Sequence, residues 1–496
     1  MSVHWPIIRS LATRAKQHVI TDDARSYRGI DLLVAAMHTA AEIERTCSSK
    51  HVGLLLPTSG AFPIAALAAW MLGKVIVPLN YLLKRSELAY VIEHSGVDTV
   101  ITVQPMLDHL GYEPEGCRLL RLDRIHFKSV PEMRWPATAS NDDLAMLLYT
   151  SGTTGLPKGV MLTHGNLKAN IRQGIGGMGI SKRDVFLGVL PQFHSFGVTQ
   201  LTLTPLTVGG KVVYTARFNA KKILQLMREH GTTTFVGIPS MYNALAMSKD
   251  AKPEDVAHMR LLVSGGEPLP DAVLERFEAK FGKTICEGYG MTEMSPATHC
   301  GTPGRRKRYS VGPPLPGVEQ RIIDPETEAD IGLNTDGEIR MRGPNIMRGY
   351  YRDPAATAKA IDDQGYMRTG DIGRIDDDGF LFITGRLKEM IIVGGENVFP
   401  REVEEVLVKQ EAVSAAGVCG IHDSMRGEVV IAFVELKEGK SASPEELRTW
   451  CRERLAGYKC PREVHIVDAL PRNPTGKIMR RELHTLLPKR EQVTAD

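Results

Sequence analysis

The stretch LAMLLYTSGTTGLPKG, from Leu144 to Gly159, decides how the rest of this sequence is interpreted. Its first six residues, Leu144 to Tyr149, are largely apolar and predict a buried strand. The residues from Thr150 to Gly159 combine hydroxyls, glycines and Lys158. Glycines let a backbone approach an anion closely, successive N–H groups form an anion-binding concavity, and a lysine adds a point charge. The stretch therefore predicts a strand followed by a loop that binds phosphate.

This loop differs from the Walker A phosphate loop. The Walker A pattern, GxxxxGK[ST], requires serine or threonine directly after the lysine. Lys158 is followed by Gly159, and the other candidate, Gly282-Lys283-Thr284, lacks the upstream glycine. The chemistry of P-loop NTPases is therefore disfavoured. An ordinary glycine-rich turn stays open as an alternative, because that is the commonest use of such a composition.

Strand-like and helical segments alternate from about residue 50 to 290. Such alternation predicts parallel sheets covered by helices, with ligands at the carboxyl ends of the strands. We expect strands at Val52–Leu56, Val75–Leu79, Thr99–Val103, Ala145–Tyr149, Val185–Leu190, Val212–Tyr214, Thr234–Ile238, Leu261–Ser264 and Ile285–Tyr289. Helices are expected at Phe62–Leu72, Ala220–His230 and Asp271–Phe281. The fold class is α/β, with a large N-terminal domain of parallel-rich sheets and flanking helices.

The composition changes after about residue 310, where glycine, proline and acidic turns become dense and the expected strands shorten. The last hundred residues predict a small α+β C-terminal domain. We place the N-terminal domain at residues 1–385 and the C-terminal domain at 386–496. The strands expected after residue 310 are Glu338–Arg342, Phe380–Thr384, Met390–Val393, Ala415–Val418 and Val429–Glu435, and the helices are Arg401–Lys409, Pro444–Leu455 and Lys477–Leu487.

Composition excludes several classes of protein. The chain has 496 residues and a net charge of +3, so no strong nucleic-acid field is expected, and the basic run Arg305–Arg308 is interpreted as a solvated loop. Its 7 cysteines form no CxxC pair, which predicts reduced thiols in a cytoplasmic protein. Met1–Thr21 has no signal-peptide pattern and no run reaches 18 apolar residues. We expect a soluble protein with at most peripheral membrane contact.

Six motifs follow one another along the chain. They are TSGTTGLPKG (150–159), PQFHSFG (191–197), EGYGMTE (287–293), YMRTGD (366–371), GRLKEMIIVGGENVFPREVE (385–404) and PRNPTGKI (471–478). With these motifs the chain resembles adenylate-forming ligases of the acyl-CoA synthetase type, which are related to firefly luciferase and to peptide-synthetase adenylation domains. The resemblance covers essentially the whole chain, although it is weak before residue 50. It implies ATP, Mg²⁺, a carboxylic acid and coenzyme A as ligands.

The resemblance assigns roles to individual residues. It implies catalytic roles for Lys477, Glu293, Thr153 and His194. The residues implied in nucleotide or coenzyme A binding are Thr150, Ser151, Gly152, Thr154, Gly155, Lys158, Gly266, Glu267, Pro268, Glu287, Gly288, Tyr289, Gly290, Met291, Thr292, Asp371, Arg386, Lys388, Gly394 and Gly395.

Several of these roles have a physical basis. Tyr289 offers an aromatic face to an adenine, Thr292 a hydroxyl to a phosphate, and Glu293 a hard oxygen ligand suited to Mg²⁺ bound to substrate phosphates. Asp371 can accept hydrogen bonds from vicinal ribose hydroxyls, as the acidic residue of dinucleotide folds does. The alternatives are a solvent-facing Glu293 and an Asx turn at Asp371.

The C-terminal motifs imply motion. In the family, Lys477 bridges the carboxylate and the α-phosphate, where a positioned cation stabilises developing negative charge. Lys388 falls at the family's hinge, about which the small domain rotates between the two half-reactions. Gly394 and Gly395 would then face the active site and leave room for a pantetheine arm. The alternative for Lys388 is an exposed linker residue without a special role.

The acid is the least specified substrate. PQFHSFG contains no aspartate that would pair with an ammonium, so activation of an amino acid is disfavoured. We expect a pocket that takes a medium- or long-chain fatty acid, with aromatic and short acids as alternatives. Its glycines leave volume for an alkyl chain, unless they serve turns only. The expected lining is His194, Phe196, Gly237, Ser240, Gly265 and Gly266.

The acceptor is expected to be coenzyme A, with a free acyl carrier protein as an alternative. An aryl-CoA ligase and a luciferase-like oxygenase use the same motifs. A catalytically silent nucleotide- or acyl-binding protein would lack the charged residues of the site, whereas Glu293, Asp371, Arg386 and Lys477 are all present.

Overall fold

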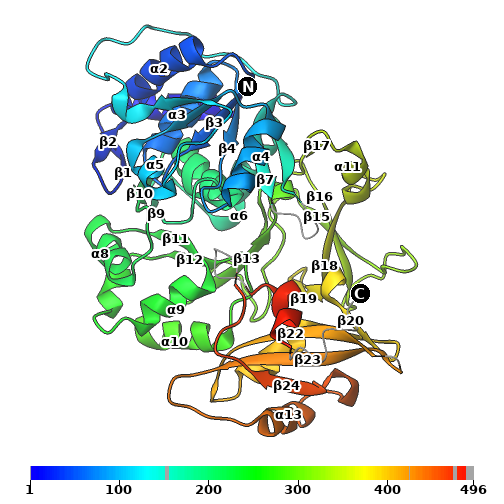
Figure 1. Cartoon of the computed structure of the whole chain (residues 1–496). Helices are drawn as coiled ribbons and strands as arrows, with labels where there is room; N and C mark the ends of the chain where they lie inside the picture. The colour runs from blue at the N-terminus through cyan, green and yellow to red at the C-terminus, as the bar shows by residue number, and fades with distance from the viewer. Residues whose placement is uncertain (1, 151–155, 424, 473–477, 488–496) are drawn as a thin grey trace. The chain divides into compact units, whose positions relative to one another are not determined.

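The computed structural model describes residues 2–150, 156–423, 425–472 and 478–487. The chain divides into two compact units, one of residues 1–319 with 341–367 and one of residues 320–340 with 368–496 (Figure 1). Both units combine helices and strands, so the predicted α/β class is confirmed. Among the described residues, the predicted site residues of the first unit lie in and around its two large sheets, and those of the second unit lie on its strands or in the turns that follow them.

An eight-stranded sheet forms one half of the first unit. Its interior pairs are parallel, and only the outer pairs β1–β2 and β13–β14 are antiparallel. Predicted strands of this sheet are confirmed within a few residues of each end. In spatial order the strands are β14 (Ala297–Cys300), β13 (Cys286–Gly290), β12 (Leu261–Ser264), β11 (Thr234–Gly237), β9 (Val185–Gly188), β10 (Lys211–Tyr214), β1 (His18–Thr21) and β2 (Ser26–Arg28).

A seven-stranded sheet forms the other half of the first unit. It is parallel from β7 through β6 and antiparallel at its opposite edge, where β8 and β17 are added. The strands in spatial order are β17 (Gly349–Tyr350), β8 (Lys158–Thr163), β7 (Leu144–Thr150), β4 (Val75–Pro78), β3 (His51–Leu55), β5 (Thr99–Thr102) and β6 (Arg118–Arg121).

Helices cover both sheets, as the ribbon in Figure 1 shows. They are α1 (His4–Thr13), α2 (Gly29–Thr46), α3 (Ala61–Met71), α4 (Arg85–Ser95), α5 (Gln104–Leu110), α6 (His164–Met178), α7 (Thr204–Val208), α8 (Ala220–His230), α9 (Pro239–Met247), α10 (Asp271–Phe281) and α11 (Pro354–Ala360). Shorter turns are η1 (Leu122–Arg124), η3 (Pro253–Val256) and η4 (Thr292–Met294), and η2 (Phe196–Leu203) is a π-helix.

Helix α3 shows how composition sets position in this unit. Every residue from Phe62 to Met71 is buried, because a helix that is apolar on all sides must be enclosed. The Trp70 indole N–H donates to the Ala145 carbonyl at 2.8 Å, which ties α3 to the strand that precedes the phosphate loop. The predicted helix at Phe62–Leu72 is confirmed with its bounds moved by one residue.

Strands β7 and β8, on either side of the predicted phosphate-binding segment, form an antiparallel hairpin that the sequence did not predict. Strand β8 follows the loop and pairs antiparallel with β7, so that Thr150 lies opposite Lys158. Strand β17 then pairs with the other edge of β8, with Tyr350 opposite Val160. The Pro-Lys-Gly sequence that opens β8 is typical of turns, which concealed the strand.

The second unit contains most of a four-stranded sheet and a complete five-stranded sheet. The first sheet runs β15 (Glu319–Ile323), β16 (Gly337–Arg342), β18 (Met367–Ile375) and β19 (Leu381–Arg386). The second runs β21 (Glu396–Val398), β20 (Ile391–Val393), β23 (Gly427–Leu436) and β22 (Val413–Asp423), with β24 (Glu463–Ile466) on β23. The helices of this unit are α12 (Pro400–Val408) and α13 (Pro444–Arg452), with single turns η5 (Leu387–Glu389), η6 (Gly457–Lys459) and η7 (Arg480–Leu486).

The predicted helix at Lys477–Leu487 is wrong in type and start. Ile478 forms a β-bridge with Arg472, so no helix begins there, and the turn that follows is a 3₁₀ helix from Arg480. The Arg480 guanidinium binds the carboxylates of Glu389 and Glu404, which fixes this last turn against α12. Strand β22 is also longer than predicted, because it pairs with β23 along its whole length.

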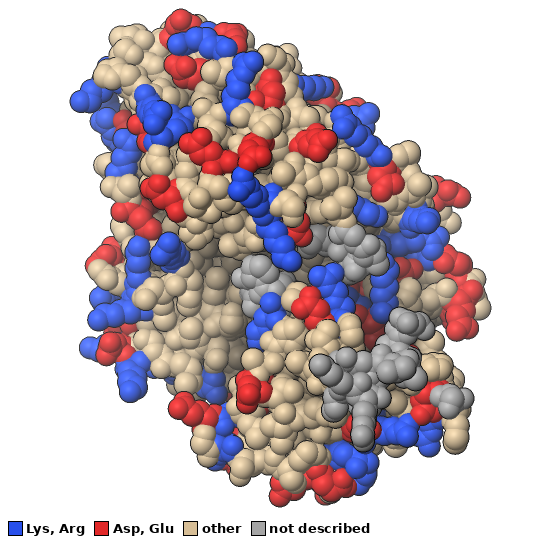
Figure 2. Space-filling model, viewed as in Figure 1, with Lys and Arg blue, Asp and Glu red and all other residues tan. Residues whose placement is uncertain are grey.

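Charged groups of both signs are interspersed over the face seen in Figure 2, with no extended field of one sign. This distribution agrees with the small net charge of +3. Among the residues that the structure describes, no helix combines the length and the apolar character needed to cross a bilayer.

The N-terminal helix is anchored by two buried histidines. The Val3 backbone N–H donates to His164 Nδ1 at 3.2 Å, and His4 Nε2 bonds the Ala137 carbonyl at 3.1 Å. Burial lowers the pKa of both imidazoles from 6.5 to about 4. The folded protein therefore keeps both rings neutral, whereas the unfolded chain protonates them below about pH 6.5. Their contribution to stability is complete above pH 6.5 and is lost as pH falls towards 4.

We predict that His164→Gln makes the stability of the protein less sensitive to acid. The wild-type free energy of unfolding should fall by about 2 kcal/mol per buried histidine between pH 7 and pH 5, and the variant should lose one such contribution. Urea unfolding at several pH values measures the slope. His258→Gln is the control, because His258 is exposed. An unchanged slope in His164→Gln would contradict the assignment.

Candidate active site

The two ends of the phosphate loop are held together by the β7–β8 hairpin. Thr150 and Lys158 are partners across the two strands. The Lys158 ammonium lies 4.0 Å from the Asp353 carboxylate and 5.2 Å from the centre of the Tyr350 ring, over its face. The predicted site residues Ser151, Gly152, Thr153, Thr154, Gly155 and Lys477 lie outside the described residues.

The EGYGMTE motif continues from a parallel strand into a turn. Strand β13 holds Glu287 to Gly290, and Met291 leads into the 3₁₀ turn η4 with Thr292 and Glu293. A Cβ at Gly290 would lie 2.0 Å from the Pro296 carbonyl oxygen, so only glycine fits there. Gly288 is less tightly enclosed, with a Cβ position 3.1 Å from the Val263 side chain. The centres of the Tyr289 and His299 rings are 6.1 Å apart, and the two ring planes are inclined at 46° to each other.

Glu293 is held by its side chain and by its backbone. The Tyr350 hydroxyl donates to Glu293 Oε1 at 2.8 Å, and the Met347 backbone N–H donates to the Glu293 carbonyl at 2.7 Å. Burial and the adjacent Glu293 charge raise the pKa of Tyr350, so its hydroxyl stays protonated and donates. Tyr350 was not predicted as a site residue. The only feature of the sequence that could have indicated it is the aromatic pair after glycine in the segment Gly349-Tyr350-Tyr351.

A hydroxyl pair joins two motifs that are about a hundred residues apart in the sequence. Ser195 Oγ and Thr292 Oγ1 lie 3.2 Å apart, within hydrogen-bond distance. Phe196, the next residue, lies 3.7 Å from the position that a Gly265 Cβ would occupy. The predicted acyl-pocket residues and the predicted phosphate-binding turn are therefore neighbours in the first unit.

His194 is neutral in this environment. It is half-buried beside Phe193, with ring centres 4.5 Å apart, and burial lowers its pKa to about 4. Its buried Nε2 atom has no hydrogen-bond partner among the described residues. Phe193 in turn packs edge-to-face on Tyr81 at 4.7 Å. The wall that His194 contributes is thus aromatic and uncharged.

The π-helix η2 starts next to this wall, at Phe196. A π-helix is rare and often marks a functional site. Gly197, its second residue, has no room for a side chain, because a Cβ would lie 2.1 Å from the Pro191 carbonyl oxygen. The geometry of the PQFHSFG motif therefore depends on this glycine.

The remaining predicted pocket residues lie where β11 and β12 end. The Gly265 N–H donates to the Gly237 carbonyl at 3.1 Å, and Gly266 has a φ of +82°, which favours glycine. Ser240 is exposed in the first turn of α9. Turn geometry thus accounts for Gly266 without a ligand, whereas a Cβ at Gly265 would lie 3.3 Å from the Gly288 carbonyl oxygen. Glu267 and Pro268 follow in the loop that leads to α10.

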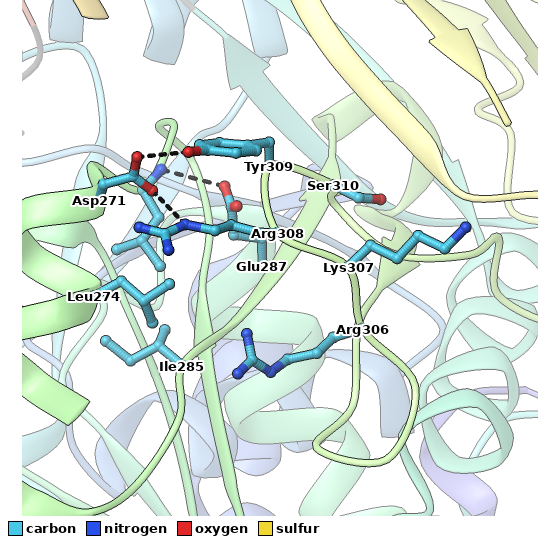
Figure 3. A pocket seen from close by; sticks show the side chains of 10 residues that line it. Asp271, Leu274, Ile285, Glu287, Arg306, Lys307, Arg308, Tyr309 and Ser310 are labelled. Carbon is cyan, nitrogen blue, oxygen red and sulfur yellow. Dashed lines mark hydrogen bonds and ion pairs between the residues drawn. The ribbon is translucent and has the colours of Figure 1, made fainter. Parts of the chain in front are cut away.

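Glu287 holds that loop in place. Its Oε2 atom accepts a hydrogen bond from the Leu269 backbone N–H at 3.2 Å, directly after the Gly265–Pro268 segment. Figure 3 shows Glu287 lining a pocket with residues of α10 and of the basic loop. The structure therefore places the Glu287 carboxylate on the loop backbone, where it positions the segment expected to bind the nucleotide.

The basic loop that lines the same pocket is ion-paired. Arg308 and the Tyr309 hydroxyl, which donates at 2.8 Å, both bind the Asp271 carboxylate (Figure 3). Arg308 also binds the Glu275 carboxylate, and Arg306 lies 3.2 Å from Glu278. All three acids lie on α10. The run that was expected to be a solvated loop is thus attached to this helix.

In the second unit, Asp371 and Arg386 are brought together. They are paired across the antiparallel strands β18 and β19, and Arg386 Nε lies 2.8 Å from Asp371 Oδ1. Asp371 is buried, with 4% of its surface exposed, whereas Arg386 is exposed. Asp371 and Arg386, which are both predicted to contact the nucleotide, therefore form an ion pair with each other.

Lys388 and the glycine pair lie beyond β19. Lys388 is exposed in the 3₁₀ turn η5, between β19 and β20. Gly394 and Gly395 form the two-residue turn between Val393 and Glu396, with φ angles of +62° and +89°. Such a turn favours glycine at both positions, so hairpin geometry is sufficient reason for both residues.

The site fits a magnesium ion that the nucleotide carries. Across the described ranges, no three His, Cys, Asp or Glu side chains gather as a metal cage. Mg²⁺ is commonly bound by one or two carboxylates together with substrate phosphates. The single carboxylate of Glu293, oriented by Tyr350, matches that arrangement.

Comparisons with known proteins agree with the geometry. Residues 14–351 match the family model of the AMP-binding enzyme, and residues 402–477 match that of the AMP-binding enzyme C-terminal domain. The chain is 32% identical to a long-chain-fatty-acid–CoA ligase of Bacillus subtilis (strain 168), over 91% of this chain and 89% of that protein. It is also 32% identical to 4-coumarate–CoA ligase 5 of Oryza sativa subsp. japonica, over 98% and 95%.

A solved structure extends the likeness to three dimensions. The crystal structure of ATP-bound MatB from Rhodopseudomonas palustris superimposes with a TM-score of 0.88 at 30% identity, over 97% of this chain and 98% of that one. The match spans both units. This chain therefore belongs to the AMP-binding enzyme family, in the adenylate-forming superfamily that includes the acyl- and aryl-CoA ligases.

Proposed function

We propose that this protein uses ATP to activate a medium- or long-chain fatty acid as its acyl-adenylate and then transfers the acyl group to coenzyme A. The observation that carries the proposal is the contact between Ser195 and Thr292, whose hydroxyl oxygens are 3.2 Å apart. It brings the aromatic wall at His194 next to the turn that presents Glu293. A carboxylic acid bound against that wall would have its carboxylate beside the phosphates of ATP.

The chemistry has two steps. A carboxylate oxygen attacks the α-phosphorus, the bond between that phosphorus and the bridging oxygen to the β-phosphorus breaks, and pyrophosphate leaves. The thiolate of coenzyme A then attacks the acyl carbonyl, and AMP leaves with the bonding electron pair. Mg²⁺ would neutralise phosphate charge, and Glu293 is the residue that would hold it.

In the first step, different residues of the chain bind different charged groups of ATP and the acid. Lys158, at the base of the hairpin, binds the β- and γ-phosphates that leave, together with Thr150, Thr153 and the loop backbone. Lys477 stabilises the carboxylate and the α-phosphate. Asp371 accepts hydrogen bonds from the ribose, and its partner Arg386 holds the carboxylate in place by a charge-assisted hydrogen bond. Tyr289 stacks on the adenine.

We place the moving part of the molecule at residues 386–496, with the hinge at Lys388. The 3₁₀ turn at Leu387–Glu389 supports this assignment, because it is an exposed single turn between strands. A change of φ and ψ at one such position rotates everything that follows. The Gly394-Gly395 turn would then reach the pantetheine arm in the second step.

Aliphatic substrates are favoured by the wall of the pocket. The wall is uncharged, because His194 is neutral and Phe193 and Phe196 are aromatic. The similarity to a long-chain-fatty-acid–CoA ligase supports the same choice. An aryl-CoA ligase is the second candidate, because the similarity to a 4-coumarate–CoA ligase is equally strong and aromatic walls also stack on aromatic acids.

The test of substrate class is pyrophosphate release measured across a panel of acids, with and without coenzyme A. We expect acids of eight to eighteen carbons to give the highest kcat/KM, by about tenfold or more over benzoate, coumarate and acetate. Thioester should form only when coenzyme A is present. A preference for aromatic acids would replace the fatty-acid proposal with the aryl one. Pyrophosphate release without thioester would indicate an acyl carrier protein as the acceptor.

We predict that Lys477→Ala slows adenylation by ~10²–10³-fold, since it removes a cation from the transferring phosphoryl group. Thioester formation from supplied acyl-adenylate should stay close to the wild-type rate. Single-turnover measurements of each half-reaction separate the two effects. Equal loss in both halves would contradict the role of Lys477.

We predict that Asp371→Asn lowers the affinity for AMP by about tenfold, because hydrogen bonds to a charged acceptor are stronger than neutral ones. The diagnostic ligand is 2′,3′-dideoxy-AMP, which has no ribose hydroxyls to donate. Wild type should discriminate against it, and the variant should not. Asp336→Asn is the control, because Asp336 pairs with Arg374 in an exposed ion pair of the same unit. Equal discrimination by wild type and Asp371→Asn would sink the assignment.

A further inference from the structure

We propose that Tyr350 is a positioning residue that orients Glu293 with its hydroxyl and Lys158 with its ring, so that both side chains meet the pyrophosphate end of ATP. The inference rests on the proposed function. It adds a residue to which no role was assigned by the motifs. It is based on the geometry of one side chain. Tyr350 contacts both Glu293 and Lys158, the two residues predicted to lie at the phosphates, although they belong to different elements.

The first contact is with the carboxylate. The Tyr350 hydroxyl donates to Glu293 Oε1 at 2.8 Å. A hydrogen bond to an ionised oxygen is stronger than a neutral one and fixes the rotation of the carboxylate. Groups that hydrogen-bond a metal ligand commonly set its orientation and tune its affinity. Tyr350 would therefore determine which way Glu293 presents its oxygens to a metal on the phosphates.

The second contact is with the ammonium. Lys158 Nζ lies over the Tyr350 ring, 5.2 Å from its centre. An aromatic face attracts a cation that lies within about 6 Å of its centroid. The Asp353 carboxylate, 4.0 Å from the same ammonium, adds a second attraction. Lys158 is thus held near the base of the hairpin before any phosphate is bound.

The fold fixes Tyr350 between these two groups. Strand β17 pairs with β8, which places Tyr350 opposite Val160 and two residues along the strand from Lys158. The Tyr350 N–H donates to Thr357 Oγ1 at 2.8 Å, which attaches β17 to α11. The Glu293 carbonyl accepts from the Met347 N–H at 2.7 Å, so the backbone of the η4 turn is also bound to the segment that carries Tyr350.

A purely structural role for Tyr350 makes different predictions. A residue that only supports packing would, when changed, lower stability and weaken all nucleotides alike. A positioning residue for the phosphate end should affect ATP with magnesium and leave AMP unchanged, since AMP lacks the β- and γ-phosphates. The two roles of Tyr350 can be separated as well, because Tyr350→Phe removes the hydroxyl and keeps the ring.

The experiment is equilibrium binding by calorimetry, without acid or coenzyme A so that no turnover occurs. The ligands are ATP with Mg²⁺, ATP with EDTA, and AMP. Tyr350→Phe should weaken ATP with Mg²⁺ by about tenfold, as for other groups that orient metal ligands. It should change ATP with EDTA and AMP by less than about twofold. Tyr350→Leu, which also removes the ring, should weaken ATP under both conditions and spare AMP.

A double-mutant cycle tests the route of the effect. In the Glu293→Gln background, Tyr350→Phe should cause little further loss with Mg²⁺, because the two residues act as a unit. Tyr351→Phe is the matched control. It is the next residue, its ring packs against His51 and His94, and no change is expected with any of the three ligands. Thermal unfolding checks that every variant is folded.

The outcomes separate this inference from the proposed function. Wild type that binds ATP with Mg²⁺, together with Tyr350→Phe that binds it equally well, overturns only the role of Tyr350. Equal weakening of ATP and AMP in Tyr350→Phe also overturns that role and indicates a packing residue. Wild type that binds neither nucleotide overturns the proposed function together with this inference.

Discussion

Strand β8 is hydrogen-bonded along both of its edges, to β7 on one side and to β17 on the other. The first pairing closes the phosphate loop into a hairpin, with Thr150 and Lys158 opposite each other. The second brings Tyr350 from nearly two hundred residues away to the base of the same hairpin. The contacts among Lys158, Tyr350 and Glu293 depend on this three-strand edge, since no two of these residues belong to the same element.

Two hydroxyl contacts connect that edge to the rest of the first unit. Tyr350 bonds Glu293, and Thr292, the residue before it, meets Ser195 of the aromatic wall. The residues proposed to bind the phosphates and those proposed to bind the acid are therefore connected through the single turn η4. Asp371 and Arg386 are likewise connected in two ways, because they are partners across two strands and also form an ion pair.

The sequence predicted the parallel strands and long helices well, because their apolar runs and periodicities are local. Helices α8 and α10 have the predicted bounds, and α3 differs by one residue. The predictions failed where pairing between segments far apart in the sequence determines the secondary structure. Strand β8 is opened by turn-forming residues and exists because β7 and β17 flank it. Ile478 forms a bridge with Arg472 where a helix was expected. Tyr350 could not be found, because its partners lie far away in the sequence.

The central claim is that the site directs a carboxylate to the α-phosphorus while the hairpin edge retains the departing phosphates. The most direct measurement uses a fatty acid labelled with ¹⁸O in its carboxylate, ATP and coenzyme A, followed by mass spectrometry of the products. The account predicts one ¹⁸O atom in each AMP and none in pyrophosphate. Label in pyrophosphate or inorganic phosphate, or AMP without label, would contradict it.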